Sequence, residues 1–269
     1  MRRLYVLGPN GMLGQMVRRY FSGREGWGVV ALTERFDHEN LVDHFRRYDA
    51  EPAAVFVNGI GVIPQKVASA PDLMLTNVLL PLELARTLAG HHHLVHPSTD
   101  CVFRGDLGRP YASMAAPDAT GVYAWSKLQA ERILMARPNT LVLRNSIIGP
   151  NVGVTSGLLQ WFLSQPRGAA LKGFTNQQWN GLTTLQWCVE VERLLTGPTD
   201  ARARLVQLGS REAYSKYDML NLFKRAFRPD VTLEPVAHPH SIDWRLQPDI
   251  EVPSLPEQLE RLRPYLELA

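Results

Sequence analysis

A glycine-rich turn directly after a short apolar run most constrains what this chain can fold into. The run Leu4-Tyr5-Val6-Leu7 is followed by Gly8-Pro9-Asn10-Gly11-Met12-Leu13-Gly14, and residues 12–21 then have a helix-like pattern. Glycines in this spacing permit a tight turn, close approach to the backbone and close packing of the helix on the strand. The turn therefore predicts a strand–turn–helix unit whose helix N-terminus faces an anion.

Apolar runs alternate with helix-like segments through the first 150 residues. Strand-like runs lie at residues 29–32, 54–58, 94–96 and 140–144, and helical spacing lies at residues 41–48, 73–88 and 123–135. The runs lack the polar alternation of a half-solvated sheet, so we expect helices on both faces. This order predicts parallel βαβ units. The fold class is α/β, a Rossmann-type doubly wound parallel sheet with ligands at the carboxyl ends of its strands.

A tyrosine and a lysine four positions apart, Tyr123 and Lys127, follow the hydroxyl-bearing segment Ser98-Thr99-Asp100. Four residues are about one helical turn, so the phenol and the amine share a helix face. An ammonium near a phenol lowers the pKa of the phenol, which suits Tyr123 to act as a general acid or base. Ser98 or Thr99 is placed to hydrogen-bond a reacting oxygen, and Ser98 is also expected to bind the cofactor. Together with the glycine turn, this order predicts a nicotinamide-dependent site in which Lys127 also holds the nicotinamide ribose.

Further segments fall near the expected carboxyl ends of strands. In Thr33-Glu34-Arg35, the carboxylate suits the ribose diol of NAD and the arginine suits the 2′-phosphate of NADP. We therefore expect NADP or NAD as cofactor, with a slight preference for NADP. Asn58-Gly59-Ile60-Gly61 offers small residues over which a cofactor can lie. Asn77, inside the following helix, is expected either to contact the cofactor or to tie a neighbouring loop.

The pattern changes after Pro150. We expect residues 1–150 to form the NAD(P)-binding domain and residues 183–208 to return to its sheet. Residues 151–182 and 209–269 are expected to form a smaller, partly interleaved substrate-binding lobe. Its last helix is expected to start at Ser254, which has capping-box spacing to Glu257.

Composition argues against several classes of protein. The chain has 29 Lys and Arg against 26 Asp and Glu, so neither a nucleic-acid nor a membrane surface is expected. No apolar stretch approaches membrane-spanning length, and a cytoplasmic location is the default expectation. Cys101 and Cys188 suggest neither a disulfide framework nor a metal site. His91, His92 and His93 are adjacent and converge poorly on a metal, so we expect no metal and a solvated helix end.

In these motifs and their order, the chain resembles the extended short-chain dehydrogenase/reductases, and within them the dTDP-4-dehydrorhamnose reductase group. The residues that carry the resemblance are the glycine turn at 8–14, Ser98-Thr99-Asp100-Cys101-Val102-Phe103, Val122-Tyr123-Ala124-Trp125-Ser126-Lys127, Leu143-Arg144-Asn145-Ser146 and the segment at 173–184.

The resemblance implies a chemistry and a set of site residues. It implies reduction by NAD(P)H of the C4 keto group of a nucleotide-linked 4-keto-6-deoxy sugar, with Thr99, Tyr123 and Lys127 as catalytic residues. Family members are often homodimers. The substrate contacts that we expect come from Thr99, Asp100, Phe103, Ser146 and Trp179.

Two alternatives stay open at this point. A nucleotide-sugar epimerase uses the same Tyr and Lys, although epimerases tend to be longer and usually carry Val-Tyr-Gly where this chain has Val102-Phe103-Arg104. A non-catalytic dinucleotide-binding regulatory protein would keep the fold, but the retention of Tyr123 and Lys127 argues for turnover. A 4,6-dehydratase is disfavoured because Cys101 follows Asp100 where that branch has a second acid.

Overall fold

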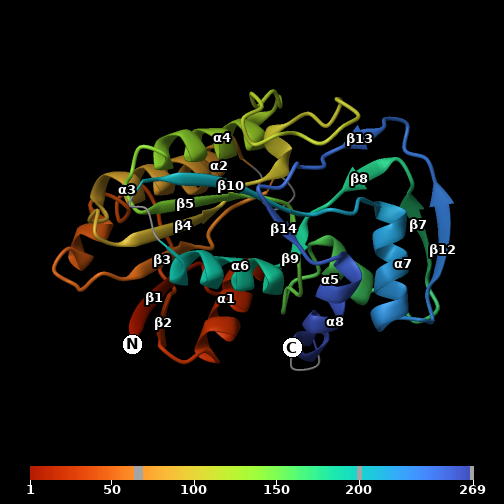
Figure 1. The fold of residues 1–269 in the computed structure, drawn as a ribbon, viewed down its shortest axis with the longest axis horizontal. Coiled ribbons are helices and arrows are strands. Elements are labelled where there is room, and N and C mark those ends of the chain that lie inside the picture. The colour runs from red at the N-terminus through yellow and green to blue at the C-terminus, as the bar shows by residue number, and fades with distance from the viewer. Residues whose placement is uncertain (64–68, 199–201, 267–269) are drawn as a thin grey trace.

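The structure, a computed structural model, describes residues 1–63, 69–198 and 202–266 (Figure 1). Within these residues, a seven-stranded parallel sheet has the order β14-β10-β5-β4-β3-β1-β2. Its strands are β1 (Arg2–Leu7), β2 (Trp27–Leu32), β3 (Val55–Asn58), β4 (His93–Pro97), β5 (Thr140–Arg144), β10 (Arg204–Ser210) and β14 (Ile250–Val252). The predicted doubly wound sheet is thereby confirmed, and its winding reverses between β1 and β3, where such folds bind ligands.

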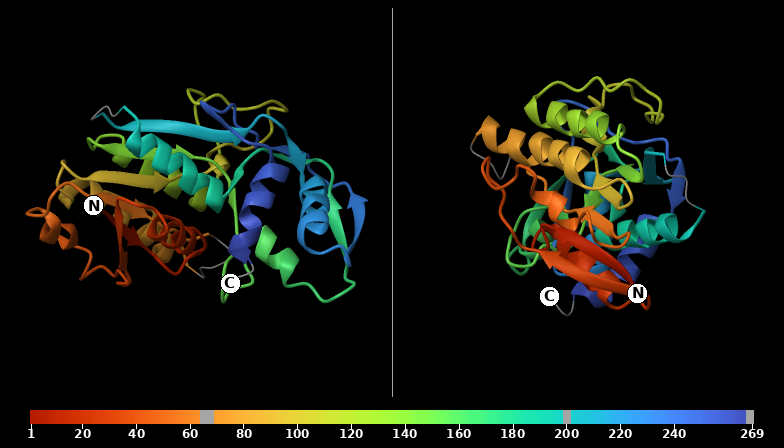
Figure 2. Two further views of the ribbon diagram at one scale, coloured as in Figure 1. Left: turned by 60° about the horizontal axis from the view of Figure 1, so that its bottom comes forward. Right: turned by 90° about the vertical axis from the view of Figure 1, so that its left-hand side faces the viewer.

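Helices cover both faces of the sheet. On one face lie α1 (Met12–Ser22) and α6 (Thr184–Thr196), and on the other lie α2 (Ala70–Met74), α3 (Leu80–Thr87) and α4 (Val122–Leu134) (Figures 1 and 2). Side chains alternate between the faces of a strand. Accordingly, Leu4 and Val6 of β1 join one hydrophobic cluster, whereas Tyr5 and Leu7 join another. This double burial explains why β1 is an unbroken apolar run in the sequence.

Two predicted helices differ from the sequence pattern. Within residues 41–48, the structure has a 3₁₀ turn at His44–Tyr48 rather than an α-helix. Residues 73–88 fall in α2, a π-helical turn at Leu75–Leu79, and α3. Pro81 near the start of α3 has no backbone N–H to donate four residues back, and the π turn lies directly before it.

The remaining elements form the lobe beside the carboxyl edge of the sheet (Figure 1). They are β6 (Ile147–Ile148), α5 (Leu158–Leu163), β7 (Ala170–Phe174), β8 (Gln177–Trp179), β9 (Leu182–Thr183), β11 (Tyr214–Ser215), α7 (Lys216–Phe227), β12 (Thr232–Val236), β13 (Ile242–Asp243) and α8 (Leu255–Leu266). After these first lobe elements, β10 pairs with β5 of the sheet, and β14 pairs with β10. The backbone N–H and hydroxyl of Ser254 both donate to Glu257 just before α8, as predicted.

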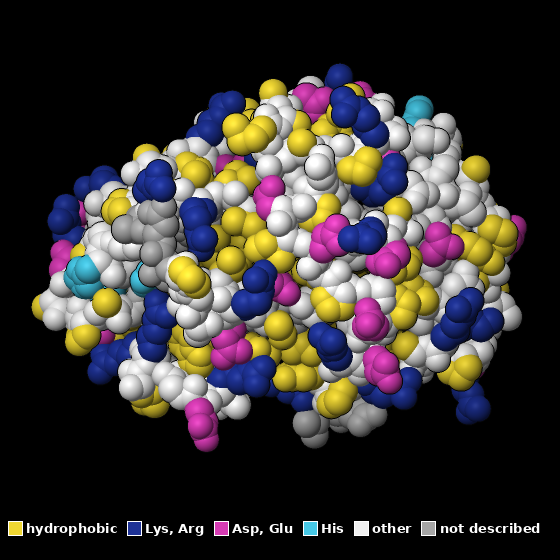
Figure 3. Space-filling view, in the orientation of Figure 1, with side chains coloured by type: hydrophobic (Ala, Val, Ile, Leu, Met, Phe, Trp, Pro, Cys, Tyr) yellow, Lys and Arg dark blue, Asp and Glu magenta, His cyan; other side chains and the backbone are white. Residues whose placement is uncertain are grey.

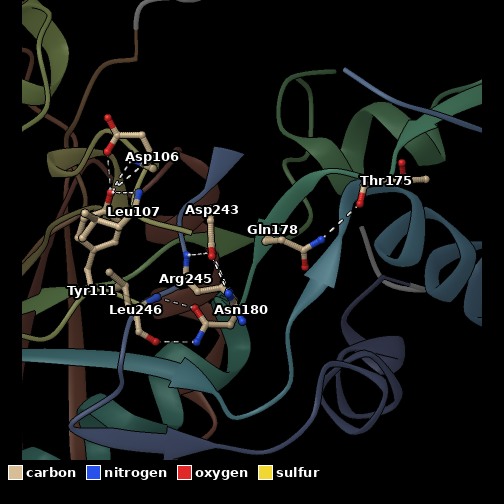
Figure 4. A network of polar contacts seen from close by, with 10 residues as sticks. Asp106, Leu107, Tyr111, Thr175, Gln178, Asn180, Asp243, Arg245 and Leu246 are labelled. Carbon is tan, nitrogen blue, oxygen red and sulfur yellow. Dashed lines mark hydrogen bonds and ion pairs between the residues drawn. The ribbon is translucent and has the colours of Figure 1, made fainter. Parts of the chain in front are cut away.

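A buried amide ties the lobe together near the sheet (Figure 4). Asn180 donates to the carbonyls of Ser210 and Leu246 at 3.0 and 2.8 Å, and it accepts from the Leu246 N–H at 2.9 Å. The Tyr111 hydroxyl accepts from the backbone N–H groups of Gly105 and Asp106. The Asn180 bonds join segments that lie 30 and 66 residues away in the sequence, so hydrogen bonds connect the lobe to the end of β10.

The histidine run at residues 91–93 includes one buried residue. His92 is fully buried, so the expected solvated position is wrong for this residue. Its Nδ1 accepts from Ala54 N–H and its Nε2 lies 3.0 Å from Tyr48 O, which satisfies both ring nitrogens.

On the face in Figure 3, acidic and basic side chains are interspersed. Among the described residues, no His, Cys, Asp and Glu group could hold a metal ion, and no helix is long and apolar enough to cross a membrane.

Candidate active site at the carboxyl edge of the sheet

The glycine turn after β1 is shaped by close backbone contacts. Gly8 has a φ of 66°, which favours glycine, and a Cβ on Gly14 would lie 2.1 Å from Gly8 O. Gly11 precedes α1 in an extended conformation. A Cβ there would meet nothing closer than Gly8 O at 3.6 Å. Gly14 therefore serves the packing of α1 on β1, whereas the backbone at Gly11 is left open to a ligand.

A pocket of about 390 Å³ lies against this turn. Its walls come from the carboxyl ends of β1, β2 and β3 and from the π-helical turn. The predicted cofactor residues that line it are Gly8, Asn10, Gly11, Glu34, Arg35 and Ile60. An open glycine turn at a helix N-terminus next to a pocket of this volume fits the pyrophosphate and adenosine parts of a dinucleotide.

Other residues predicted to bind the cofactor do not line this pocket. Met12 begins α1, and the Leu13 side chain is buried in the hydrophobic core. Gly59 donates its N–H to Leu7 O at 2.9 Å, and Gly61 is exposed beside it. Asn77 accepts from Val62 N–H at 3.0 Å and donates to Val62 O at 2.9 Å, so its amide ties a loop.

Glu34 and Arg35 have different partners at the far end of this pocket. Glu34 lies 2.8 Å from the guanidinium of Arg47. Within the described ranges, Arg35 makes no ion pair and is exposed. The neighbouring Arg47 reduces the repulsion that Glu34 would exert on an anion, and Arg35 stays exposed at the same end of the pocket.

A second pocket of about 520 Å³ lies at the N-terminus of α4. Tyr123 lines it together with Phe103, Cys101, Arg104 and Trp244. Burial raises the pKa of Tyr123, Cys101 and Asp100 act in the same direction, and the Thr99 hydroxyl opposes them. Lys127 is not among the groups that shift this pKa, because its amine donates to Pro97 O instead.

Thr99 lies in the turn between β4 and α4 together with Asp100. The Thr99 hydroxyl accepts from Cys101 N–H at 3.1 Å, and it donates to Asp100 at 3.1 Å. Burial raises the pKa of Asp100, while hydrogen bonds from Thr99, Cys101 and Ser146 oppose this effect. The structure therefore brings Thr99, Asp100, Ser146 and Tyr123 together.

Lys127 is buried one helical turn beyond Tyr123. Its Nζ donates to Pro97 O at 2.7 Å and lies 3.3 Å from His96 Nε2. His96 Nδ1 in turn lies 3.1 Å from the side-chain nitrogen of Asn58. Burial lowers the pKa of Lys127 to about 8, and the Glu131 carboxylate opposes this shift. The lysine is consequently an interior group that joins α4 to the ends of β4 and β3.

A buried ion pair between α4 and β5 stabilises the same region. Arg144 and Glu131 meet at 2.6 Å with side chains only 4% and 3% exposed. The Ser98 hydroxyl also donates to Glu131. Ser98, predicted to bind the cofactor, is therefore engaged within the protein.

Two predicted substrate residues lie largely in the interior. Phe103 stacks on Tyr111 with ring centroids 4.2 Å apart, and it borders the second pocket from there. Trp179 is 8% exposed, belongs to the main hydrophobic cluster and packs where a Cβ on Gly181 would clash with its ring.

Sequence reasoning missed several residues of the site. His96 is a polar side chain within an otherwise apolar strand, which was a usable signal. Trp244 reaches the second pocket from the lobe, and no local sequence pattern predicts that it does so. Asn145 is buried with both polar atoms of its amide unpaired among the described residues. It follows β5 at the same edge of the sheet.

Comparisons with known proteins find reductases among the relatives of this chain. The chain is 31% identical over 196 residues to a probable dTDP-4,6-dihydroxy-2-methyloxan-3-one 4-ketoreductase of Streptomyces antibioticus, covering 66% of this chain and 63% of that protein. It is also 31% identical over 159 residues to a dTDP-4-dehydrorhamnose reductase of Mycobacterium tuberculosis, covering 54% and 49%. The chain thus spans about half to under two thirds of the curated relatives it matches.

Solved structures share the fold at low identity. A dTDP-4-dehydrorhamnose reductase from Clostridium acetobutylicum superimposes with a TM-score of 0.81 at 18% identity, covering 98% of this chain and 99% of that one. One from Bacillus anthracis in complex with NADP gives a TM-score of 0.81 at 17% identity, covering 99% and 100%.

A family model identifies the chain more directly. The model described as RmlD substrate binding domain matches residues 1–153, which include the glycine turn, Thr99, Tyr123 and Lys127. This match confirms the resemblance to the dTDP-4-dehydrorhamnose reductase group, and the chain belongs to the RmlD substrate binding domain family.

Proposed function

We propose that this protein uses NAD(P)H to reduce the C4 keto group of a nucleotide-linked 4-keto-6-deoxy sugar. The observation that supports the proposal is the hydrogen bond between Thr99 and Tyr123 at the carboxyl end of β4, with Lys127 one turn further along α4 and bonded to Pro97 O, near a pocket that fits a dinucleotide. The names of the two reductase relatives support the same substrate class.

The side chains around the second pocket account for proton transfer. Thr99 and Tyr123 hydrogen-bond the keto oxygen, and Tyr123 donates its proton as negative charge develops there. The nicotinamide, when bound, supplies the hydride. An ammonium on Lys127 holds the nicotinamide ribose and favours the phenolate that Tyr123 becomes. Asp100 and Ser146, which lie together, are placed to contact sugar hydroxyls.

The same geometry supports a choice of cofactor and a division of the chain into two parts. We favour NADP over NAD because Arg47 pairs with Glu34 while Arg35 is left exposed. Residues 1–150 provide the cofactor domain, and residues 151–182 with 209–269 provide most of the substrate lobe. Trp244 in the second pocket supports that assignment. A homodimer stays a prediction.

The test is NADPH oxidation by purified protein given dTDP- or UDP-linked 4-keto-6-deoxyhexoses. We expect turnover that falls at least about a thousandfold in Tyr123→Phe, which loses the proton donor. Tyr265→Phe on α8 is the matched control and should retain full activity. Cofactor binding, followed by fluorescence, should survive in both variants.

Other outcomes separate the competing functions. Interconversion of sugars without net NADPH consumption would identify an epimerase. Dinucleotide binding without turnover on any 4-keto sugar would favour a regulatory binding protein. Turnover that persists in Tyr123→Phe would refute the assigned proton donor.

A further inference from the structure

A line of hydrogen bonds runs behind the reacting groups, from Lys127 through His96 to Asn58. Lys127 Nζ lies 3.3 Å from His96 Nε2, and His96 Nδ1 lies 3.1 Å from the Asn58 Nδ2. Asn58 Oδ1 accepts from Ile60 N–H at 3.1 Å. His96 and Asn58 are 1% and 0% exposed, so water does not replace these partners. The line connects α4 with the floor of the dinucleotide pocket, which Ile60 borders.

The backbone fixes the direction of every bond in this line. The Ile60 N–H can only donate, so the oxygen of the Asn58 amide must face it and the NH₂ group must face His96. His96 Nδ1 therefore accepts and carries no proton. A neutral imidazole then carries its proton on Nε2 and donates it toward Lys127. An amine nitrogen can accept that bond through its lone pair while donating to Pro97 O, whereas an ammonium has no lone pair.

We propose that Asn58 and His96 are positioning residues that favour the amine form of Lys127, because Asn58 fixes His96 as the Nε2–H tautomer. His96 could accept a hydrogen bond from an ammonium only if its proton moved from Nε2 to Nδ1. There the proton would point at the NH₂ group of Asn58, which is also a donor. The proton of Lys127 is thereby linked to the loop at the dinucleotide pocket.

The charged groups around Lys127 leave this preference in place. His96 on β4 is neutral, and burial lowers its pKa well below the ordinary value. Glu131 on α4 favours the ammonium, but Arg144 on β5 binds both of its carboxylate oxygens. Burial also favours the amine form, because it lowers the pKa of Lys127 to about 8.

This inference rests on the proposed function only in its consequence. The proposed reaction needs an ammonium beside Tyr123. At a pH where the free protein holds Lys127 as an amine, Lys127 must therefore gain a proton when the cofactor binds. Protein that binds NADPH near pH 8 should accordingly take up a proton, as measured by calorimetry in two buffers of different ionisation enthalpy.

The direct test is long-range ¹H–¹⁵N spectroscopy of the histidine rings, which distinguishes the two tautomers without any substrate. We expect His96 as the Nε2–H tautomer in the wild-type protein. In Asn58→Asp, the carboxylate keeps the bond from Ile60 and accepts from Nδ1–H, so His96 should change tautomer. The titration midpoint of Lys127, followed through its ¹³Cε shift, should then rise by about one pH unit or more. His92, held by Ala54 and Tyr48, is the internal control and should keep its Nε2–H tautomer.

Each outcome decides the question. A wild-type His96 that carries its proton on Nδ1 overturns the proposal even if Asn58→Asp fails to fold. A rise in the Lys127 midpoint without a tautomer change would reflect the added charge alone and would also overturn it. Neither result touches the proposed reduction, which the Tyr123-dependent oxidation of NADPH tests separately.

Discussion

The glycine turn allows folding and binding to be separated by two matched substitutions, Gly14→Ala and Gly11→Ala. At Gly14, the new Cβ would lie 2.1 Å from Gly8 O, and that distance must grow to about the 3.0 Å below which Cβ atoms are essentially never found. The clashing atom is backbone, so no side chain can rotate away. Overpacking of this kind costs about 1–3 kcal/mol and sometimes more, against a helix-propensity gain of about 1 kcal/mol.

Because the contact is with backbone and so short, we take the upper end of this cost, and we expect Gly14→Ala to lose about 2 kcal/mol of unfolding free energy. Thermal and urea unfolding followed by circular dichroism measure it, and the melting temperature should fall by about 4–8 °C. A variant that unfolds at or above the wild-type temperature would refute the argument that α1 must approach β1 this closely.

Gly11→Ala should show the opposite pattern. Its Cβ would meet Gly8 O at 3.6 Å and Gly59 O at 3.8 Å, which are ordinary contacts, and its φ of −78° suits alanine. We expect a stability change of no more than about 1 kcal/mol. The methyl group would project over the surface proposed for the pyrophosphate, so NADPH should bind at least about tenfold more weakly, or about 1.4 kcal/mol. Unchanged NADPH affinity would contradict the placement of the cofactor.

Further predictions concern the buried ion pair, the buried histidine and the choice of cofactor. Glu131→Gln leaves Arg144 unpaired in the interior and should cost about 3–5 kcal/mol in urea unfolding, whereas Glu251→Gln in an exposed pair should cost less than about 1 kcal/mol. Burial lowers the pKa of His92, so below its ordinary value of 6.5 the unfolded chain binds a proton that the folded chain does not. Stability should then fall from pH 7 to pH 5, and less so in His92→Gln. Arg35→Ala should weaken NADPH binding several-fold while leaving NADH binding nearly unchanged, and equal losses for both would remove the basis for preferring NADP.

Local patterns predicted much of the sheet, because its strands are buried on both faces. Leu4 and Val6 pack on one side and Tyr5 and Leu7 on the other, so β1 is apolar throughout. The same reasoning failed for His92, whose partners Ala54 and Tyr48 lie about 40 residues earlier. A polar residue with distant partners cannot be distinguished in sequence from a solvated one.

The candidate site shows the same division between local and distant information. Tyr123 and Lys127 share one helix, so their spacing predicted their proximity along it. The direction of the Lys127 amine could not be predicted, because Pro97 and His96 on a neighbouring strand attract it. Trp244 enters the second pocket from a segment whose position depends on the completed lobe.

The late arrival of β14 has a consequence for synthesis of the chain. Chains are made from the N-terminus, and domains tend to fold as units during synthesis. Here the strand that covers the edge of β10 lies at residues 250–252, well after β10 ends at Ser210. Until it is made, β10 presents unpaired backbone groups at an open edge, where another nascent chain can pair. Ribosomes that stall between residues 210 and 250 should consequently yield an aggregation-prone product, although most of the sheet has already been translated.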